Sequence, residues 1–136
     1  MNRLCGGLLS LILISTWTNT IAEPPAVARQ LEQYRAQGAG PFDAERGKAF
    51  WEGPHRHAGN GETRRCTQCH GMDPRRPGKH RRTGKVIGPM APSVNPKRFT
   101  DTRKIEKWFK RNCKWTLGRL CTAQEKGDVL TYLARR

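Results

Sequence analysis

The residues Cys66-Thr67-Gln68-Cys69-His70 form the cluster in this chain whose types and spacing most directly predict a chemistry. Two thiols separated by two residues lie about one helical turn apart, so both can reach the two vinyl groups of one porphyrin. The histidine that follows can bring its imidazole to the iron from the same side. The pattern therefore predicts one covalently attached haem c per chain, held by Cys66 and Cys69, with His70 as the proximal iron ligand.

Two other interpretations of these cysteines stay open. A redox-active disulfide between Cys66 and Cys69 would need a strand-helix-strand pattern around it, and the sequence shows no clear strands. A four-cysteine zinc site would combine the same pair with Cys113 and Cys121. Export to an oxidising compartment and the adjacent His70 both argue against zinc.

The first 22 residues have the features of a secretory signal peptide. Arg3 gives a positive start, the apolar run 8–14 is too short for a stable bilayer span, and Ala22 ends a cleavage-site pattern of small residues. We expect cleavage after Ala22, a periplasmic location and no stable membrane anchor afterwards. An uncleaved anchor is the alternative. Cys5 would be lost with this segment, which leaves four cysteines.

The chain is short and strongly basic, and both properties restrict its function. It has 136 residues and a formal net charge of +15, of which only Arg3 belongs to the predicted leader. A small domain with this charge is marginal from burial alone, so we expect a disulfide or a cofactor to stabilise it. The charge also predicts an acidic partner, and export argues against nucleic acid. A solvated basic surface without a single partner is the alternative.

The remaining pattern predicts an all-α fold with long irregular loops. A short amphipathic helix is possible at 26–35, and a helix at 44–51 is capped by Asp43. A third helix is expected from Thr102 to about Asn112, and a last one starts at Thr122 with a capping-box sequence. Residues 71–98 are rich in proline and glycine and are expected to be irregular.

These elements resemble the class I cytochromes c, which place three core helices around one haem. Gly47 and Trp51 resemble the glycine and aromatic pair of the first helix, and 128–133 resembles the terminal helix that crosses it. The glycine allows a close approach of the two backbones. Pro89 resembles the proline whose carbonyl accepts a hydrogen bond from the proximal histidine. We accordingly divide the chain into a signal peptide (1–22), an N-terminal extension (23–40) and a cytochrome c domain (41–136).

The identity of the sixth iron ligand is the open question. Met72 lies two residues after His70, and Met90 directly follows Pro89, so both belong to the proximal side. Three histidines are also candidates, but all lie in polar, arginine-rich stretches: His55, His57 and His80.

The helix expected at 102–112 offers a further candidate. Its residues Ile105, Trp108 and Phe109 form an apolar stripe that would pack in the haem pocket, and Asn112 continues this stripe. A polar residue at the end of a buried stripe needs a partner. Asn112 either makes a structural hydrogen bond, for example as a left-handed helix-terminal residue, or directs its amide oxygen to the iron.

From about Gly40 to its end, the chain resembles the SHP-type cytochromes c, named after sphaeroides haem protein. The Arg111-Asn112-Cys113 segment is the most specific of those that carry the resemblance. The others are 44–47, 66–71, 82–85, 91–93, 98–101, 106–108 and 121–122. The resemblance implies that Asn112 is the sixth ligand of the oxidised iron, that it leaves on reduction, and that Cys113 and Cys121 form a disulfide beside it. Met90 departs from the family pattern, and we interpret it as a packing substitution.

The resemblance also implies a function. We expect a redox-gated distal site that accepts an electron and then binds a diatomic ligand such as oxygen or nitric oxide. The donor would be another c-type cytochrome, often a dihaem one, with an acidic docking surface. Alternatives are a six-coordinate electron-transfer cytochrome with methionine or histidine as sixth ligand, or an enzyme such as a peroxidase or nitric oxide oxygenase. We favour electron transfer and ligand binding over turnover.

Overall fold

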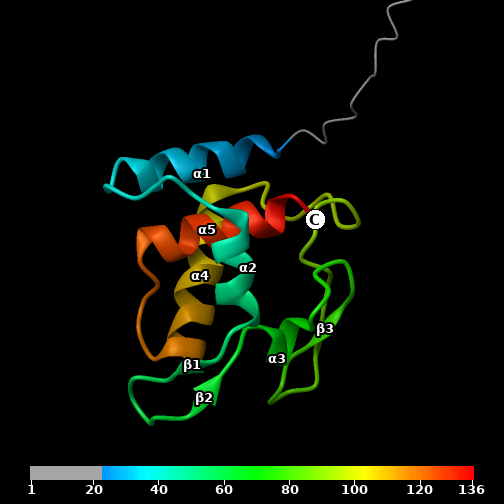
Figure 1. Cartoon of the computed structure of the whole chain (residues 1–136). Coiled ribbons are helices and arrows are strands. Elements are labelled where there is room, and N and C mark those ends of the chain that lie inside the picture. Colours follow the sequence, from blue (N-terminus) through cyan, green and yellow to red (C-terminus); the bar gives the residue numbers. More distant parts are fainter. Residues whose placement is uncertain (1–22) are drawn as a thin grey trace, which may run out of the picture.

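The computed structural model describes residues 23–136 (Figure 1). The predicted signal peptide lies outside these residues. Within the described range the helices are α1 (Pro25–Arg35), α2 (Ala44–Glu52), α3 (Thr67–His70), α4 (Thr102–Leu117) and α5 (Ala123–Ala134). The strands are β1 (His55–Arg56), β2 (Thr63–Arg64), β3 (Gly78–Lys79) and β4 (Val86–Ile87). From residue 23 onward, no helix is long and apolar enough to span a membrane.

Helices dominate this architecture, as predicted, and the strands only close two small hairpins. Strand β1 pairs with β2 in antiparallel register, with His55 opposite Arg64, and β3 pairs with β4, with Gly78 opposite Ile87. Each strand has two residues. The expectation that the chain has no strands is therefore wrong. Strands of two residues are too short to show the alternating hydrophobic pattern by which a strand is predicted from sequence.

Helices α2 and α5 cross in close contact at Gly47. A Cβ atom on this residue would lie 2.0 Å from the backbone carbonyl oxygen of Asp128, so only glycine fits there. Asp128 is buried and accepts hydrogen bonds from Arg46 and from the backbone N–H of Asp43. The predicted role of Gly47 in the helix crossing is confirmed. The Asp43 cap is confirmed too, because its side chain accepts from the N–H of Arg46.

Helix α1 lies across α5 and is part of the hydrophobic core (Figure 1). Its residues Val27 and Tyr34 are fully buried, in a cluster with Ile105 of α4 and Leu130 of α5. The Tyr34 hydroxyl donates a hydrogen bond to the carboxylate of Glu106 on α4. Helix α1, which belongs to the segment predicted as an N-terminal extension, thus packs against both α4 and α5.

Helix α4 is longer than predicted. The Asp101 side chain caps its first turn, as expected, but the helix continues past Asn112 to Leu117. Cys113, Thr116 and Leu117 are buried and extend its inner face. Gly118, with φ of 74°, then ends the helix in the left-handed conformation. The expected end at residue 112 is wrong, and so is the idea that Asn112 is the left-handed terminal residue.

Helix α5 begins with the predicted capping box. The Thr122 side chain accepts from the N–H of Glu125, and the Glu125 carboxylate accepts from the N–H of Thr122. Arg119 also donates to both oxygens of this carboxylate, at 2.8 and 2.7 Å. These contacts fix the short connection between α4 and α5.

The crossing at Gly47 leads to a prediction about stability. Gly47→Ala should lower the free energy of unfolding by at least about 1 to 3 kcal/mol, because its methyl group would meet backbone atoms that cannot move aside. Lys48→Ala is the matched control on the exposed side of the same helix, with an expected change within about 0.5 kcal/mol. Chemical denaturation of the two purified proteins measures the difference. Equal unfolding midpoints would refute the close crossing.

Candidate haem-binding site

The Cys-x-x-Cys-His motif lies on the single-turn helix α3. Cys66 precedes the first helical residue, and Gly71, with φ of 73°, ends the turn after His70. Both thiols are free, so the alternative of a disulfide between Cys66 and Cys69 is not what the structure shows. Strand β3 packs directly against this turn, because a Cβ on Gly78 would lie 2.1 Å from the carbonyl oxygen of Cys69. The turn therefore has a backbone support on one side.

The other side of the motif faces an apolar wall built by α2 and α5. Cys66 packs against a buried cluster composed of Trp51, Val129, Tyr132 and Leu133. Burial raises the pKa of the Cys66 thiol to about 12, so the sulfur is neutral in this position. Met90 and Phe109 pack against the same cluster. Such a wall suits the flat apolar face of a porphyrin.

His70 is partly buried against this wall, with its ring centroid 5.0 Å from that of Trp51. Burial lowers the pKa of His70 to about 4, and the positive charge of Arg98 adds to the effect. The imidazole is thus neutral at physiological pH, which is the form that ligates iron. This state agrees with the predicted role of His70.

Two buried nitrogen atoms beside the motif lack a hydrogen-bond partner in residues 23–136. They are Nδ1 of His70 and Nε1 of Trp51. Buried polar groups without a partner are rare and call for an explanation. A haem held by Cys66 and Cys69 fits here, because its iron would take the imidazole of His70 and its carboxylates could accept a hydrogen bond from the indole of Trp51.

The expected hydrogen bond from His70 to Pro89 is not formed. The Pro89 carbonyl instead accepts from Nε of Arg98 at 2.7 Å and from Nδ2 of Asn95 at 3.0 Å. The following residue, Met90, packs against the same cluster as Cys66. Sequence analysis missed both donors, because nothing in the local pattern around them predicts a contact with this carbonyl.

Helix α4 presents an exposed stripe of unusual composition. Trp108, Asn112 and Trp115 follow one another at spacings of four and three, so they share one side of the helix. The exposed fractions of the two tryptophans are 48% and 36%, and Asn112 is exposed between them. Large apolar side chains gathered on one exposed stripe usually indicate a binding surface. The stripe is suited to lie against a haem, with Asn112 at its centre.

Arginines and an open cavity border this stripe. The guanidinium of Arg111 lies 4.9 Å from the Trp108 ring, and that of Arg64 lies 5.0 Å from the Trp115 ring. The cavity has a volume of about 410 Å³ and is lined by Glu62, Thr63, Arg64, Arg81 and Trp115. Sequence analysis overlooked Trp115, although its position seven residues after Trp108 could have revealed it.

The residues of the apolar stripe predicted for the helix at 102–112 lie in two different environments. Ile105 is buried in the cluster with α1, so its burial does not depend on haem. Phe109 packs against both core clusters, including the one that Cys66 contacts. Trp108 and Asn112 belong instead to the exposed side. Helix α4 therefore contacts the core with one face and offers the adjacent face to a ligand.

The alternative sixth ligands lie outside the stripe of α4, and the three histidines make local hydrogen bonds. Nε2 of His55 lies 2.7 Å from the Phe50 carbonyl, and Nδ1 of His57 accepts from the N–H of Gly59. Nδ1 of His80 accepts from the N–H of Thr83. Met72 is 62% exposed. Met90 packs against the same cluster as Cys66, which agrees with its interpretation as a packing substitution.

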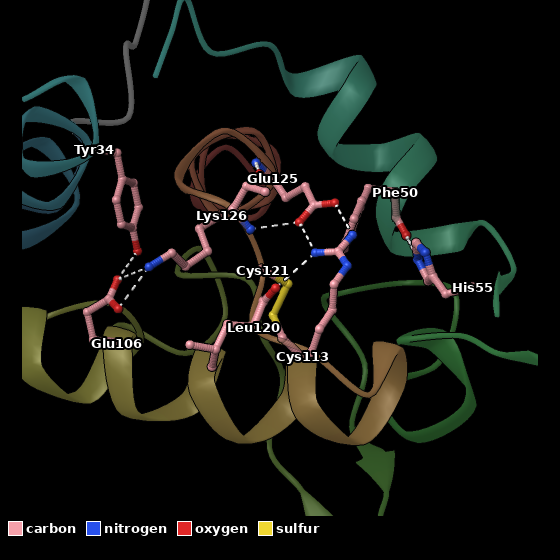
Figure 2. The surroundings of a disulfide bond; sticks show 11 residues. Tyr34, Phe50, His55, Glu106, Cys113, Leu120, Cys121, Glu125 and Lys126 are labelled. Carbon is pink, nitrogen blue, oxygen red and sulfur yellow. Dashed lines mark hydrogen bonds and ion pairs between the residues drawn. A yellow bond between two sulfur atoms is a disulfide. The ribbon is translucent and has the colours of Figure 1, made fainter. Parts of the chain in front are cut away.

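A disulfide joins Cys113 of α4 to Cys121, just before α5, as the resemblance implied (Figure 2). A four-cysteine zinc site is therefore wrong, because this pair is already bonded. About two turns away along α4, the Glu106 carboxylate accepts from Lys126 at 3.1 and 3.0 Å. Figure 2 shows the disulfide between this ion pair and the Glu125 carboxylate. The part of α4 that carries Asn112 is thus connected to α5 on both sides.

Comparisons with known proteins agree with this geometry. Residues 37–133 match the family described as "Domain of unknown function (DUF1924)". The chain is 45% identical to the cytochrome c-type protein SHP of Cereibacter sphaeroides over 114 residues, which cover 84% of this chain and 87% of that protein.

Two solved structures are similar as well. A structure of oxidized SHP, an oxygen-binding cytochrome c, has 43% identity, covers 81% of this chain and 96% of its own, and gives a TM-score of 0.72. The solution structure of cytochrome c'' from Methylophilus methylotrophus addresses haem-ligand detachment. It has 34% identity, covers 81% of this chain and 93% of its own, and gives a TM-score of 0.69. These similarities confirm the predicted fold class.

The disulfide leads to a second prediction. Replacing both Cys113 and Cys121 by serine should lower the free energy of unfolding by about 2.5 kcal/mol, because the unfolded chain regains the entropy of the opened loop. Guanidinium denaturation under non-reducing conditions measures the loss. Leu120→Ser, an exposed change inside the same loop, is the control and should stay within about 0.5 kcal/mol of the unmodified protein. A double variant as stable as this control would contradict the prediction.

Proposed function

This chain belongs to the SHP-type c-type cytochromes, and on that premise we propose that it is a periplasmic haem protein whose distal site opens on reduction. The observation that carries the proposal is the exposed stripe of α4, on which Asn112 lies between Trp108 and Trp115. A polar amide centred on an otherwise aromatic surface has the position that a weak iron ligand requires.

The proximal half of the site would be provided by α3. Cys66 and Cys69 attach the single haem c, and His70 supplies its neutral imidazole to the iron. When bound, the haem supplies an iron that changes between the ferric and ferrous states and can take a ligand on its free face. The apolar wall around Trp51 excludes water from the histidine side and keeps its imidazole in place.

Asn112 would close the distal half in the oxidised protein. An amide oxygen is a hard, weak donor, so it binds ferric iron better than ferrous iron, which prefers softer ligands. Asn112 would therefore ligate the iron in its ferric state, and in the ferrous state it would leave that position to a small ligand such as oxygen or nitric oxide. Two relatives support this proposal: SHP is an oxygen-binding cytochrome c, and haem-ligand detachment has been addressed in cytochrome c''.

The contacts that hold α4 in place support such a gate, by which we mean the release of Asn112 on reduction and its return on oxidation. The disulfide of Cys113 holds the backbone next to Asn112, and the ion pair of Glu106 with Lys126 holds the preceding turns. With the helix fixed at both points, the least costly movement of Asn112 is a change in its side-chain rotamer. The released amide can then return to the same place when the electron leaves.

The residues of the stripe favour ligand binding over catalysis. Two indoles and one amide offer no group that exchanges protons near neutral pH, whereas a peroxidase needs an acid or base beside the bound oxidant. We therefore interpret the protein as an electron-transfer and ligand-binding protein rather than a turnover enzyme.

The outer face of α4 suits an acidic electron donor. The four residues Lys104, Lys107, Arg111 and Lys114 follow one another at helical spacing and are exposed. Within the described chain, none of these four lies in an ion pair, so their charge is available to a partner. Electrostatic steering accelerates the encounter of transient redox partners. Another c-type cytochrome, in particular a dihaem one with an acidic surface, is the partner we propose.

The gate can be tested by removing its ligand. In Asn112→Val the haem should remain attached, and the ferric iron should become fully five-coordinate or water-bound, because valine has no donor atom. Absorption and electron paramagnetic resonance spectra of the ferric protein detect this change.

Asn60→Val in the exposed loop between β1 and β2 is the matched control and should leave the ferric spectra unchanged. If Asn112→Val also has the ferric spectra of the unmodified protein, Asn112 is not the sixth ligand. Persistence of a methionine-to-iron charge-transfer band would then identify a simple six-coordinate electron-transfer cytochrome.

A further inference from the structure

The basic hairpin, residues 75–87, comprises β3, β4 and the segments that precede and join them. No acidic residue lies in this stretch. Figure 1 shows the hairpin at the edge of the molecule, beside α3. Its exposed basic side chains are Arg75, Arg76, Lys79, Arg81, Arg82 and Lys85. Arg81 lines the cavity beside Trp115, and the other five do not. A dense positive charge therefore lies at this edge.

The register of the two strands decides which side chains point away from the haem motif. Gly78 faces the motif, because a Cβ atom on it would lie 2.1 Å from the carbonyl oxygen of Cys69. Neighbouring residues of a strand point to opposite faces, and residues directly opposite in an antiparallel pair share a face. Lys79 and Val86 form such a pair, so both point away from the motif. A haem held by the motif leaves this outer face exposed.

An apolar side chain accompanies the cations on the outer face. Among the large hydrophobic residues of the described chain, Val86 is the most exposed, at 69%, and it lies beside Lys79. Cations attract anionic lipid headgroups, and an adjacent apolar side chain can enter the boundary between headgroups and acyl chains. The outer face of the hairpin has both components of such a contact.

Hydrogen bonds within the turn fix its shape. The backbone N–H of His80 donates to the Lys85 carbonyl, and the N–H of Gly84 donates to the His80 carbonyl, both at 2.8 Å. Nδ1 of His80 also accepts from the N–H of Thr83. This tight turn projects its cations outward. A lipid surface adapts to such a projection, whereas a stable protein contact needs complementary shape over about 800 Å² of each partner.

We propose that the basic hairpin is a docking surface for membranes that contain anionic phospholipid. Lys79, Arg82 and Lys85 contact the headgroups, and Val86 enters the interfacial layer. The contact is peripheral and reversible. It goes beyond the proposed function and does not depend on which residue is the sixth iron ligand. Because β3 packs against α3, docking holds the haem motif close to the membrane surface.

The test is co-sedimentation of the haem-containing protein, expressed with its own leader and purified, with two kinds of lipid vesicle. One contains phosphatidylcholine alone, and the other contains about one-third phosphatidylglycerol, both at about 0.1 M salt. We expect at least about tenfold tighter binding to the anionic vesicles, because each cation at the surface contributes about fivefold.

A pair of charge variants locates the contact on the protein. Lys79→Gln combined with Lys85→Gln should weaken binding to the anionic vesicles at least about tenfold. Arg29→Gln combined with Lys48→Gln removes the same formal charge from exposed positions of α1 and α2, and it should change binding by less than about twofold. An equal loss in both double variants would overturn the proposal.

A pair of apolar variants separates a bilayer from an acidic protein as the partner. Val86→Ser should weaken vesicle binding about three- to tenfold, because the apolar contact is lost. Leu120→Ser, which removes a side chain that is 55% exposed in another loop, should leave it unchanged. If the two serine variants bind equally, the proposal is overturned.

Two further results would also overturn the membrane contact. The first is equal binding to the neutral and the anionic vesicles. The second is binding to poly-glutamate without binding to either vesicle, which would identify a docking surface for acidic protein. Ferric spectra of every variant show whether the haem site is intact, so a failure of the proposed function appears there and not in the sedimentation.

Discussion

The attachment of α4 to α5 is the constraint on which the rest of the structure depends. The disulfide between Cys113 and Cys121 and the ion pair between Glu106 and Lys126 hold one face of α4 in the core. Because this face is buried, the adjacent face of α4 points away from the protein interior. It carries Trp108, Asn112 and Trp115. A long helix held in this way can present a weakly bound ligand without moving its backbone when the ligand leaves.

The two halves of the proposed site have opposite physical characters. The proximal half lies against the core, with a neutral His70 beside Trp51. The distal half is exposed and offers an amide, which is a weak donor. A strong ligand on one side and a weak one on the other make the coordination of the iron sensitive to its oxidation state. This asymmetry distinguishes a gated binding site from a permanent six-coordinate electron carrier.

Sequence patterns predicted the features that depend on neighbouring residues. The caps at Asp43 and Thr122 and the small residue at the helix crossing follow from local spacing, and the structure confirms them. The haem motif is also a local pattern, and it is supported by the similarity to c-type cytochromes. The end of α4 was misplaced because Asn112 and Cys113 resemble a helix terminus, whereas burial of Thr116 and Leu117 continues the helix. Contacts such as those of Arg98 with Gly88 and Pro89, or of α1 with α4, join distant segments and have no local signature.

The measurement that tests the central claim most directly is the visible spectrum of the reduced protein before and after addition of carbon monoxide. If reduction releases Asn112, the ferrous spectrum is that of a high-spin or weakly ligated haem, and carbon monoxide changes it within the mixing time. A ferrous low-spin spectrum that carbon monoxide leaves unchanged would show a strong sixth ligand that stays bound, and would contradict the redox-gated site.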